Sequence, residues 1–184
     1  MAHNGDIPNF AAKRAELLAE IAPRLRRFVL GDTDSEVIFL LFLSELSANG
    51  ALGSRFGIDA VVPALRATVA KVRAICDDAD NRALLTIILT DGTTMAAVQG
   101  GKELYWSTFK KKCADRDSCP SLAAECEAPT KTGFVNHLIF SSEPLQGENI
   151  WEPLAEHEIL GVDWRMRLHR ASVDRVDLTV VMAS

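Results

Sequence analysis

Three groups of residues in this sequence have types and spacing suited to chemistry, and the first lies at its start. His3-Asn4-Gly5 places a side-chain carboxamide beside a glycine N–H, and glycine lets a substrate approach the backbone closely. Two such donors can stabilise the negative charge that develops on the oxygen of an amide under attack. Asn-Gly is also a favoured hairpin turn, so the dipeptide alone does not decide between a turn and an oxyanion site.

The second group is Thr33-Asp34-Ser35-Glu36. Thr33 and Glu36 have capping-box spacing, in which Thr33 accepts a hydrogen bond from the Glu36 amide and the Glu36 side chain reaches back. Asp34 then lies in the first helical turn, where the helix dipole favours a carboxylate whatever else that residue does. At the edge of a cleft, the same carboxylate would suit the ammonium group of an amino-acid substrate.

The third group is the cysteine loop, in which Cys113, Cys119 and Cys126 are separated by five and six residues. Three thiolates could bind a tetrahedral zinc ion, with His137 as a fourth ligand, although the spacing does not match the common Cys-x2-Cys knuckle. Unliganded thiols and a single disulfide are the alternatives. We predict no metal and no cofactor, and we keep zinc at these three cysteines as the alternative.

Helical periodicity in the first half of the chain positions the first two groups. An amphipathic pattern follows His3-Asn4-Gly5 and is interrupted by a proline, which predicts a kinked or divided helix. The next helix is apolar on every side from Val37 onward, so we expect it to be central. The expected helices are Asn9 to Leu30, divided at Pro23; Thr33 to the Asn49-Gly50 stop; and Ile58 to Asp78.

The second half has strand character. Asp91-Gly92 predicts a two-residue hairpin turn between two β-branched runs, and residues 110–132 lack any period, which predicts a long loop. Helices followed by antiparallel strands indicate an α+β fold. The expected strands are Leu84–Thr90, Thr93–Gln99, Leu104–Phe109, Phe134–Ser141, Glu158–Asp163, Trp164–His169 and Asp177–Val181.

Size and composition limit the classes of protein that this chain can be. With 184 residues, we expect one domain spanning 1–184, and 48% hydrophobic with 24% charged residues is typical of a globular protein. A formal charge of -5 argues against a nucleic-acid partner. The sequence shows neither a membrane-spanning run nor a signal peptide, so we expect a cytoplasmic protein without membrane contact.

Taken together, these segments resemble class II glutamine amidotransferases. The match reads His3-Asn4-Gly5, an amphipathic helix, and Gly31-Asp32-Thr33-Asp34-Ser35-Glu36. Leu89-Thr90-Asp91-Gly92, Leu104-Tyr105-Trp106 and Ser141-Ser142-Glu143-Pro144-Leu145 are similar to compact, stand-alone members of that family, which include ergothioneine-pathway amidohydrolases. The resemblance covers roughly residues 2 to 168.

The resemblance implies a fold and a set of roles. The fold would be that of the N-terminal nucleophile (Ntn) hydrolases, with two antiparallel sheets between helical layers, here as an incomplete four-layer αββα arrangement. Asn4 and Gly5 would form the oxyanion hole, Asp34 would hold the substrate's α-amino group, and His3 would belong to the substrate-binding group. The ligand would be glutamine or a γ-glutamyl amide. Assembly into a homo-oligomer is an open alternative.

The sequence departs from the family pattern in its nucleophile. Family members attack the amide with an N-terminal cysteine that lies upstream of the His-Asn-Gly motif, whereas the cysteines of this sequence lie in or beyond the third helix. We therefore expect a truncated, C-terminal portion of the domain that binds the amide but has no glutaminase activity. The alternative is a non-catalytic ligand- or protein-binding module with the same fold, including a zinc-stabilised form.

Overall fold

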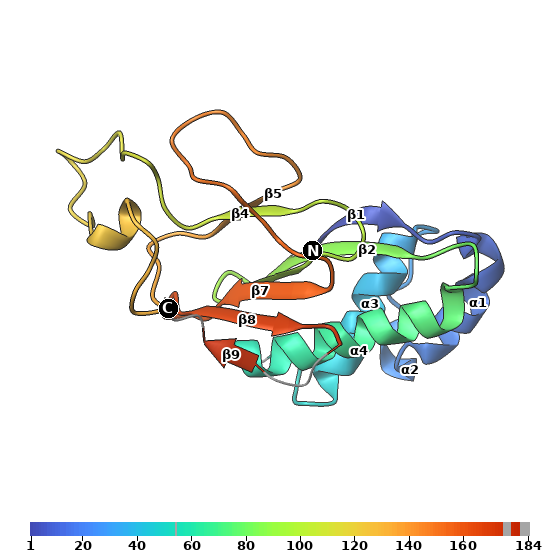
Figure 1. The fold of residues 1–184 in the computed structure, drawn as a ribbon. Coiled ribbons are helices and arrows are strands. Elements are labelled where there is room, and N and C mark those ends of the chain that lie inside the picture. The colour runs from blue at the N-terminus through green and yellow to red at the C-terminus, as the bar shows by residue number, and fades with distance from the viewer. Residues whose placement is uncertain (54, 175–177, 181–184) are drawn as a thin grey trace.

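The computed structural model describes residues 1–53, 55–174 and 178–180, and its elements follow the order drawn in Figure 1. The helices are α1 (Phe10–Glu20), α2 (Pro23–Arg26), α3 (Asp34–Ser47) and α4 (Ile58–Cys76), with a 3-10 turn at Ala124–Cys126. The strands are β1 (Ala2–Asp6), β2 (Leu84–Thr90), β3 (Met95–Val98), β4 (Tyr105–Ser107), β5 (Ile139–Ser141), β6 (Glu152–Pro153), β7 (Glu158–Val162), β8 (Leu168–Ser172) and β9 (Leu178–Val180).

The strands form two antiparallel sheets. The large sheet has the order β1-β2-β3-β7-β8-β9 and the small sheet has the order β5-β4-β6. Helices α1 to α4 cover one face of the large sheet, and the small sheet lies on the opposite side (Figure 1). The predicted mixed fold with antiparallel sheets is confirmed, while the four-layer arrangement stays a prediction. No helix in the described part of the chain is long and apolar enough to span a membrane.

The helices match the sequence prediction closely. The stretch predicted to divide at Pro23 is divided there, because α1 ends at Glu20 and Pro23 occupies the first turn of α2, where its missing N–H costs nothing. The long loop over 110–132 is also present, apart from its short 3-10 turn.

The prediction for residues 2–6 and two of the strand predictions need correction. Residues 2–6 form β1, an edge strand paired with β2, so Asn4-Gly5 is not a turn. Of the strand predicted over Phe134–Ser141, only Ile139–Ser141 is a strand. The strand predicted from Trp164 begins at Leu168, because the Asp163 carboxylate accepts the Arg165 and Arg167 amides and holds the intervening residues in a turn. Residues 177 and 181 of the final prediction lie outside the described residues.

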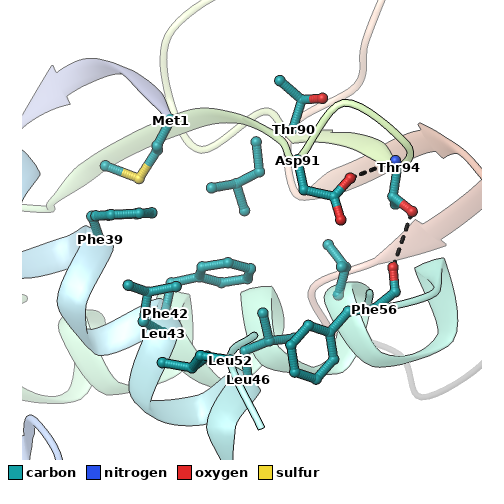
Figure 2. Close-up of a pocket in the computed structure, with 12 residues that line it drawn as sticks. Met1, Phe39, Phe42, Leu43, Leu46, Leu52, Phe56, Thr90, Asp91 and Thr94 are labelled. Carbon is teal, nitrogen blue, oxygen red and sulfur yellow. Dashed lines mark hydrogen bonds between the residues drawn. The ribbon is translucent and has the colours of Figure 1, made fainter. Parts of the chain in front are cut away.

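The hairpin between β2 and β3 is also wider than predicted. Thr90 pairs with Met95, so four residues make the turn instead of two. Oδ1 of Asp91 accepts hydrogen bonds from the Thr93 and Thr94 amides, both at 2.8 Å, and Figure 2 shows the bond to Thr94. Hydrogen bonds to the Asp91 side chain thus hold this four-residue turn in place.

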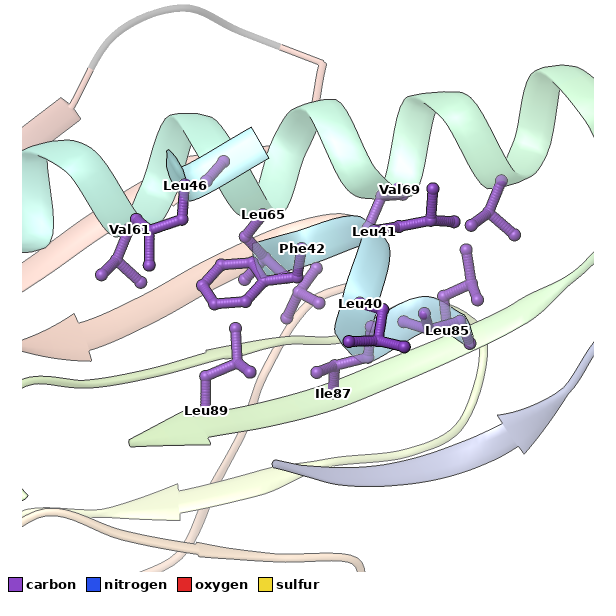
Figure 3. Packing of buried hydrophobic residues seen from close by; sticks show 14 of the residues in the cluster. Leu40, Leu41, Phe42, Leu46, Val61, Leu65, Val69, Leu85, Ile87 and Leu89 are labelled. Carbon is purple, nitrogen blue, oxygen red and sulfur yellow. The ribbon is translucent and has the colours of Figure 1, made fainter. Parts of the chain in front are cut away.

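Strand alternation on β2 separates two cores. Leu85, Ile87 and Leu89 face the helices and pack against α3 and α4 side chains such as Leu41 and Leu65 (Figure 3). The smaller cluster lies between the sheets, and partly buried Ile88 of β2 packs against it. Its buried members are Ala97, Leu104, Trp106, Val135, Leu154, Leu160, Val162 and Leu168.

An ion-pair network joins three helices. The Lys71 ammonium on α4 lies 3.0 Å from a Glu20 carboxylate oxygen at the end of α1 and 2.9 Å from a Glu45 oxygen on α3. Hydrogen bonding to Glu45, and then to Glu20, raises the pKa of Lys71, so the Lys71 ammonium stays charged at neutral pH.

Candidate functional site

The His3-Asn4-Gly5 segment forms the middle of β1, and alternation sends its side chains to opposite faces. Asn4 pairs with Thr86 of β2 and lies on the face toward the small sheet. There it lines a cavity of about 480 Å³ between the two sheets. The cavity is lined by Ala2, His3, Asn4, Thr86, Ile88, Leu104, Phe140, Ser141 and Ser142.

The Asn4 side chain is exposed, and its carboxamide forms no hydrogen bond with the described residues. By contrast, the neighbouring Thr86 hydroxyl is fully used, since it accepts the Gly100 and Lys102 amides and donates to the Lys102 carbonyl. An amide donor without a partner, on the wall of a cavity, is available to a ligand oxygen.

Gly5 has a structural reason to be glycine. A β-carbon at position 5 would overlap the Leu84 carbonyl oxygen and would lie within 2.7 Å of the His3 ring nitrogen Nε2. The close approach of β1 to β2 therefore means that any larger residue at this position would force the two strands apart. This packing requirement is independent of any contact that the Gly5 N–H makes with a ligand.

His3 contributes to the cavity wall, but its side chain is buried in contacts with Ser35 and the Leu84 carbonyl. Its side chain is 1% exposed, and its ring lies 2.9 Å from the Leu84 carbonyl through Nε2 and 3.0 Å from the Ser35 hydroxyl through Nδ1. Only a protonated Nε2 can donate to the Leu84 carbonyl, which leaves Nδ1 of a neutral ring as an acceptor. The Ser35 hydroxyl lies within reach of this nitrogen and also of Asp34 Oδ1, at 3.3 Å. His3 thus fixes β1 against the first turn of α3.

Asp34 lies at that first turn, where the predicted cap is present in modified form. Thr33 accepts the Glu36 amide at 3.3 Å, as predicted, but the Glu36 carboxylate accepts the Leu30 and Gly31 amides rather than reaching back to the cap residue. These two hydrogen bonds lower the pKa of Glu36. The reciprocal half of the predicted capping box is therefore wrong, and Glu36 instead closes the preceding loop.

The Asp34 carboxylate joins α3 to the end of β1. One oxygen accepts the Ile7 amide at 3.2 Å, and the other accepts the Ser35 amide at 2.6 Å and lies 3.9 Å from Nδ1 of His3. Its side chain is 19% exposed. The structure thus brings Asp34 and His3 together, whereas Asp34 does not line the cavity that contains Asn4.

The cysteines lie elsewhere. Cys76 is buried at the end of α4, and Cys113, Cys119 and Cys126 lie in the loop after β4, all as free thiols. None of the four lines the Asn4 cavity. Within the described residues, no three His, Cys, Asp or Glu side chains come together in a group that could hold a metal ion.

Sequence reasoning assigned no catalytic or binding role to Ser141 of β5 or to the adjacent Ser142, which line the same cavity as Asn4. Ser141 and the following Ser142 reach the cavity from the small sheet. Their contact with β1 is tertiary and depends on how the two sheets pack, which no local pattern encodes. The only signal in the sequence is that Ser141-Ser142 belongs to a segment resembling the amidotransferase family.

Comparison with solved structures shows which known proteins have a similar fold. A glutamine aminotransferase class-II domain protein from Silicibacter pomeroyi superposes with a TM-score of 0.60 over 93% of this chain, at 22% identity. A predicted glutamine amidotransferase from Pseudomonas aeruginosa gives 0.53 over 89%, at 17% identity. The chain covers 65% and 56% of these two structures, respectively.

A sequence match to a curated protein adds to the structural similarity. The chain is 33% identical over 103 residues to the probable glutamine amidotransferase DUG3 of Saccharomyces cerevisiae, a match that covers 50% of this chain and 29% of that protein. No family model matches. The predicted resemblance to class II glutamine amidotransferases is confirmed by these structures and this relative.

Proposed function

We propose that this chain is the amide-binding portion of a class II glutamine amidotransferase domain and that it binds glutamine or a γ-glutamyl amide. The observation that carries the proposal is the unpaired Asn4 carboxamide on the wall of the inter-sheet cavity. In the proposal, Asn4 and the Gly5 N–H donate to the amide oxygen of the ligand. Two donors fixed on a strand need no reorganisation as charge develops there.

Asp34 has the second role in the proposal, as the acceptor for the ligand's α-ammonium group; because Asp34 does not line the Asn4 cavity, the ligand would reach it around the exposed edge strand β1. Its carboxylate is already oriented by the Ile7 and Ser35 amides, and a charge-assisted hydrogen bond from an ammonium would add to these. His3 acts as a positioning residue, because it ties the turn that carries Asp34 to the strand that carries Asn4.

The chemistry of the class needs a thiolate at the amide carbon, and none of the four cysteines lines the Asn4 cavity. We therefore propose that the 184-residue chain alone binds the amide without hydrolysing it. Measurable glutamate release by the purified chain that disappears on Asn4→Ala would contradict this part of the proposal.

Binding can be tested by titrating the chain with L-glutamine and with Nα-acetylglutamine, followed by calorimetry or amide NMR shifts. We expect Asp34→Asn to weaken glutamine binding about tenfold, the loss of one charge-assisted hydrogen bond. Asn4→Ala should weaken the binding of both ligands. Asp34→Asn should bind Nα-acetylglutamine with the same affinity as the unmodified chain, because this ligand has no α-ammonium group. Asn49→Ala, at the exposed end of α3, is the control. Equal glutamine affinity in all four proteins would overturn the proposal.

A further inference from the structure

A second cavity lies on the helix side of the large sheet, away from the site proposed above. It has a volume of about 210 Å³ and is enclosed by α3, the start of α4 and the turn between β2 and β3 (Figure 2). It shares no lining residue with the Asn4 cavity. Its lining residues are mostly apolar, with Phe42, Leu43, Leu46 and Phe56 among them.

One end of this cavity is polar. Figure 2 shows the Asp91 carboxylate directed toward the cavity from the hairpin turn, while Thr94 donates its hydroxyl to the Phe56 carbonyl at 3.1 Å. Oδ1 of Asp91 accepts the Thr93 and Thr94 amides and the Thr93 hydroxyl, each at 2.8 Å. Its Oδ2 atom has no hydrogen bond or ion pair among the described residues.

Asp91 is charged at neutral pH. Partial burial by itself raises the pKa of this carboxyl, but the hydrogen bonds from Thr94 and Thr93 outweigh burial and hold the pKa below its usual range. A carboxylate oxygen without a partner beside an apolar cavity is a site of charge complementarity for a cation. Asp91 is exposed at the rim of the cavity, so a neutral apolar ligand would leave that oxygen to water and gain no interaction from it.

We propose that this cavity binds a small organic cation, an arylalkyl- or alkylammonium, with its ammonium group on Oδ2 of Asp91 and its apolar body between Phe42, Leu46 and Phe56. The size agrees, because an apolar cavity of about 150 Å³ accommodates a benzene molecule, and this one has about 210 Å³. Burial of the body supplies affinity, and the charge-assisted hydrogen bond to Asp91 sets orientation and selects amines over alcohols.

The probe that tests the proposal is 2-phenylethylammonium, compared with 2-phenylethanol, which has nearly the same shape without the charge. Amide NMR of the 184-residue chain should show saturable shifts in α3, in the first turn of α4 and around Asp91 with the amine. The alcohol should bind about tenfold more weakly, as expected for loss of one charge-assisted contact. Absence of saturable shifts with millimolar amine, or shifts centred on Asn4 and Thr86, would overturn the proposal.

Two variants separate charge from shape. Asp91→Asn keeps an oxygen that can accept the turn amides, so it should retain the hairpin while the amine binds about tenfold more weakly, down to the affinity of the alcohol. Leu43→Trp fills the cavity and should abolish binding of both compounds. Asp59→Asn, on the exposed first turn of α4, removes the same charge outside the cavity and is the control. If Asp91→Asn does not fold, the proposal is tested by the difference in affinity between amine and alcohol and by the loss of binding in Leu43→Trp. Equal affinity of the unmodified chain for amine and alcohol would contradict the proposal.

Discussion

The two faces of the large sheet differ in how they are filled. The helix side buries a large aliphatic cluster in which Leu41, Leu65 and Leu85 are all 0% exposed, whereas the cluster between the sheets is smaller and adjoins the 480 Å³ cavity beside Asn4. Tight packing on one side supports the strands, while incomplete packing on the other leaves room for a ligand. The difference teaches that the two faces divide the packing unequally: the helix side carries most of the buried core, with a smaller cavity at the Asp91 turn, and the other side carries the candidate amide site.

The strongest test of this division is Leu65→Ala on α4. Leu65 is 0% exposed at the centre of the helix-side cluster, so truncation leaves a cavity that the packed helices cannot close. We expect a loss of about 3–5 kcal/mol in the free energy of unfolding. Urea denaturation followed by circular dichroism measures it.

The matched variant on the other face is Leu104→Ala, which removes the same atoms from a residue that is 3% exposed but already lines the Asn4 cavity. Because neighbouring space exists before the change, we expect a smaller loss of about 2–3 kcal/mol. A loss equal to or greater than that of Leu65→Ala would break the proposed division between the faces.

Gly5→Ala tests the strand that borders both faces. The added methyl group would overlap the Leu84 carbonyl oxygen, but β1 is an edge strand and can move outward, so we expect a loss of about 1–2 kcal/mol. Gly53→Ala is the control, since its β-carbon would meet no atom within 4 Å. Equal melting temperatures for the two variants would show that β1 does not pack closely on β2.

The smallest effect is expected in the cysteine loop, where Arg116 pairs with Glu127. The hydrogen bond from Arg116, and then the Cys113 amide, lowers the pKa of Glu127 from 4.5 to about 2. A lowered carboxyl pKa contributes stability above pH 4.5 that is lost as the pH falls toward 2. Glu127→Gln should therefore melt slightly lower than the unmodified chain at pH 7, and this difference should shrink as the pH falls through 2, with Glu125→Gln as the control. A difference that does not shrink would point to lost packing instead of lost charge.

Local patterns predicted the helical half well and the strand half less well. Pro23, the Thr33 cap and the apolar run from Val37 act within one helix, so spacing alone is sufficient to place α1 to α3. The strand predicted from Trp164 failed because the Asp163 side chain binds two amides beyond it and delays β8 to Leu168. Strand ends depend on such side-chain contacts and on register, which periodicity does not contain.

The candidate site shows the same limit. The resemblance to class II glutamine amidotransferases identified Asn4, Gly5 and Asp34 as a group, and the structure joins their segments through His3. It did not predict that Asn4 and Asp34 would lie apart, with only Asn4 on the inter-sheet cavity. That separation follows from the alternation of β1, which becomes visible only once residues 2–6 are known to be a strand rather than a turn.

The pairing of β1 with β2 has a consequence for the order of folding. The hydrogen bond between His3 and the Leu84 carbonyl spans 81 positions, and all four helices lie within that loop. Closing this long loop costs more conformational entropy than forming the more local contacts within and between the helices. We therefore expect α1, α3 and α4 to form and dock before β1 pairs with β2. We therefore expect Asn4 to reach its place late in folding, and the amides of β1 to exchange with solvent sooner than those of the helical layer.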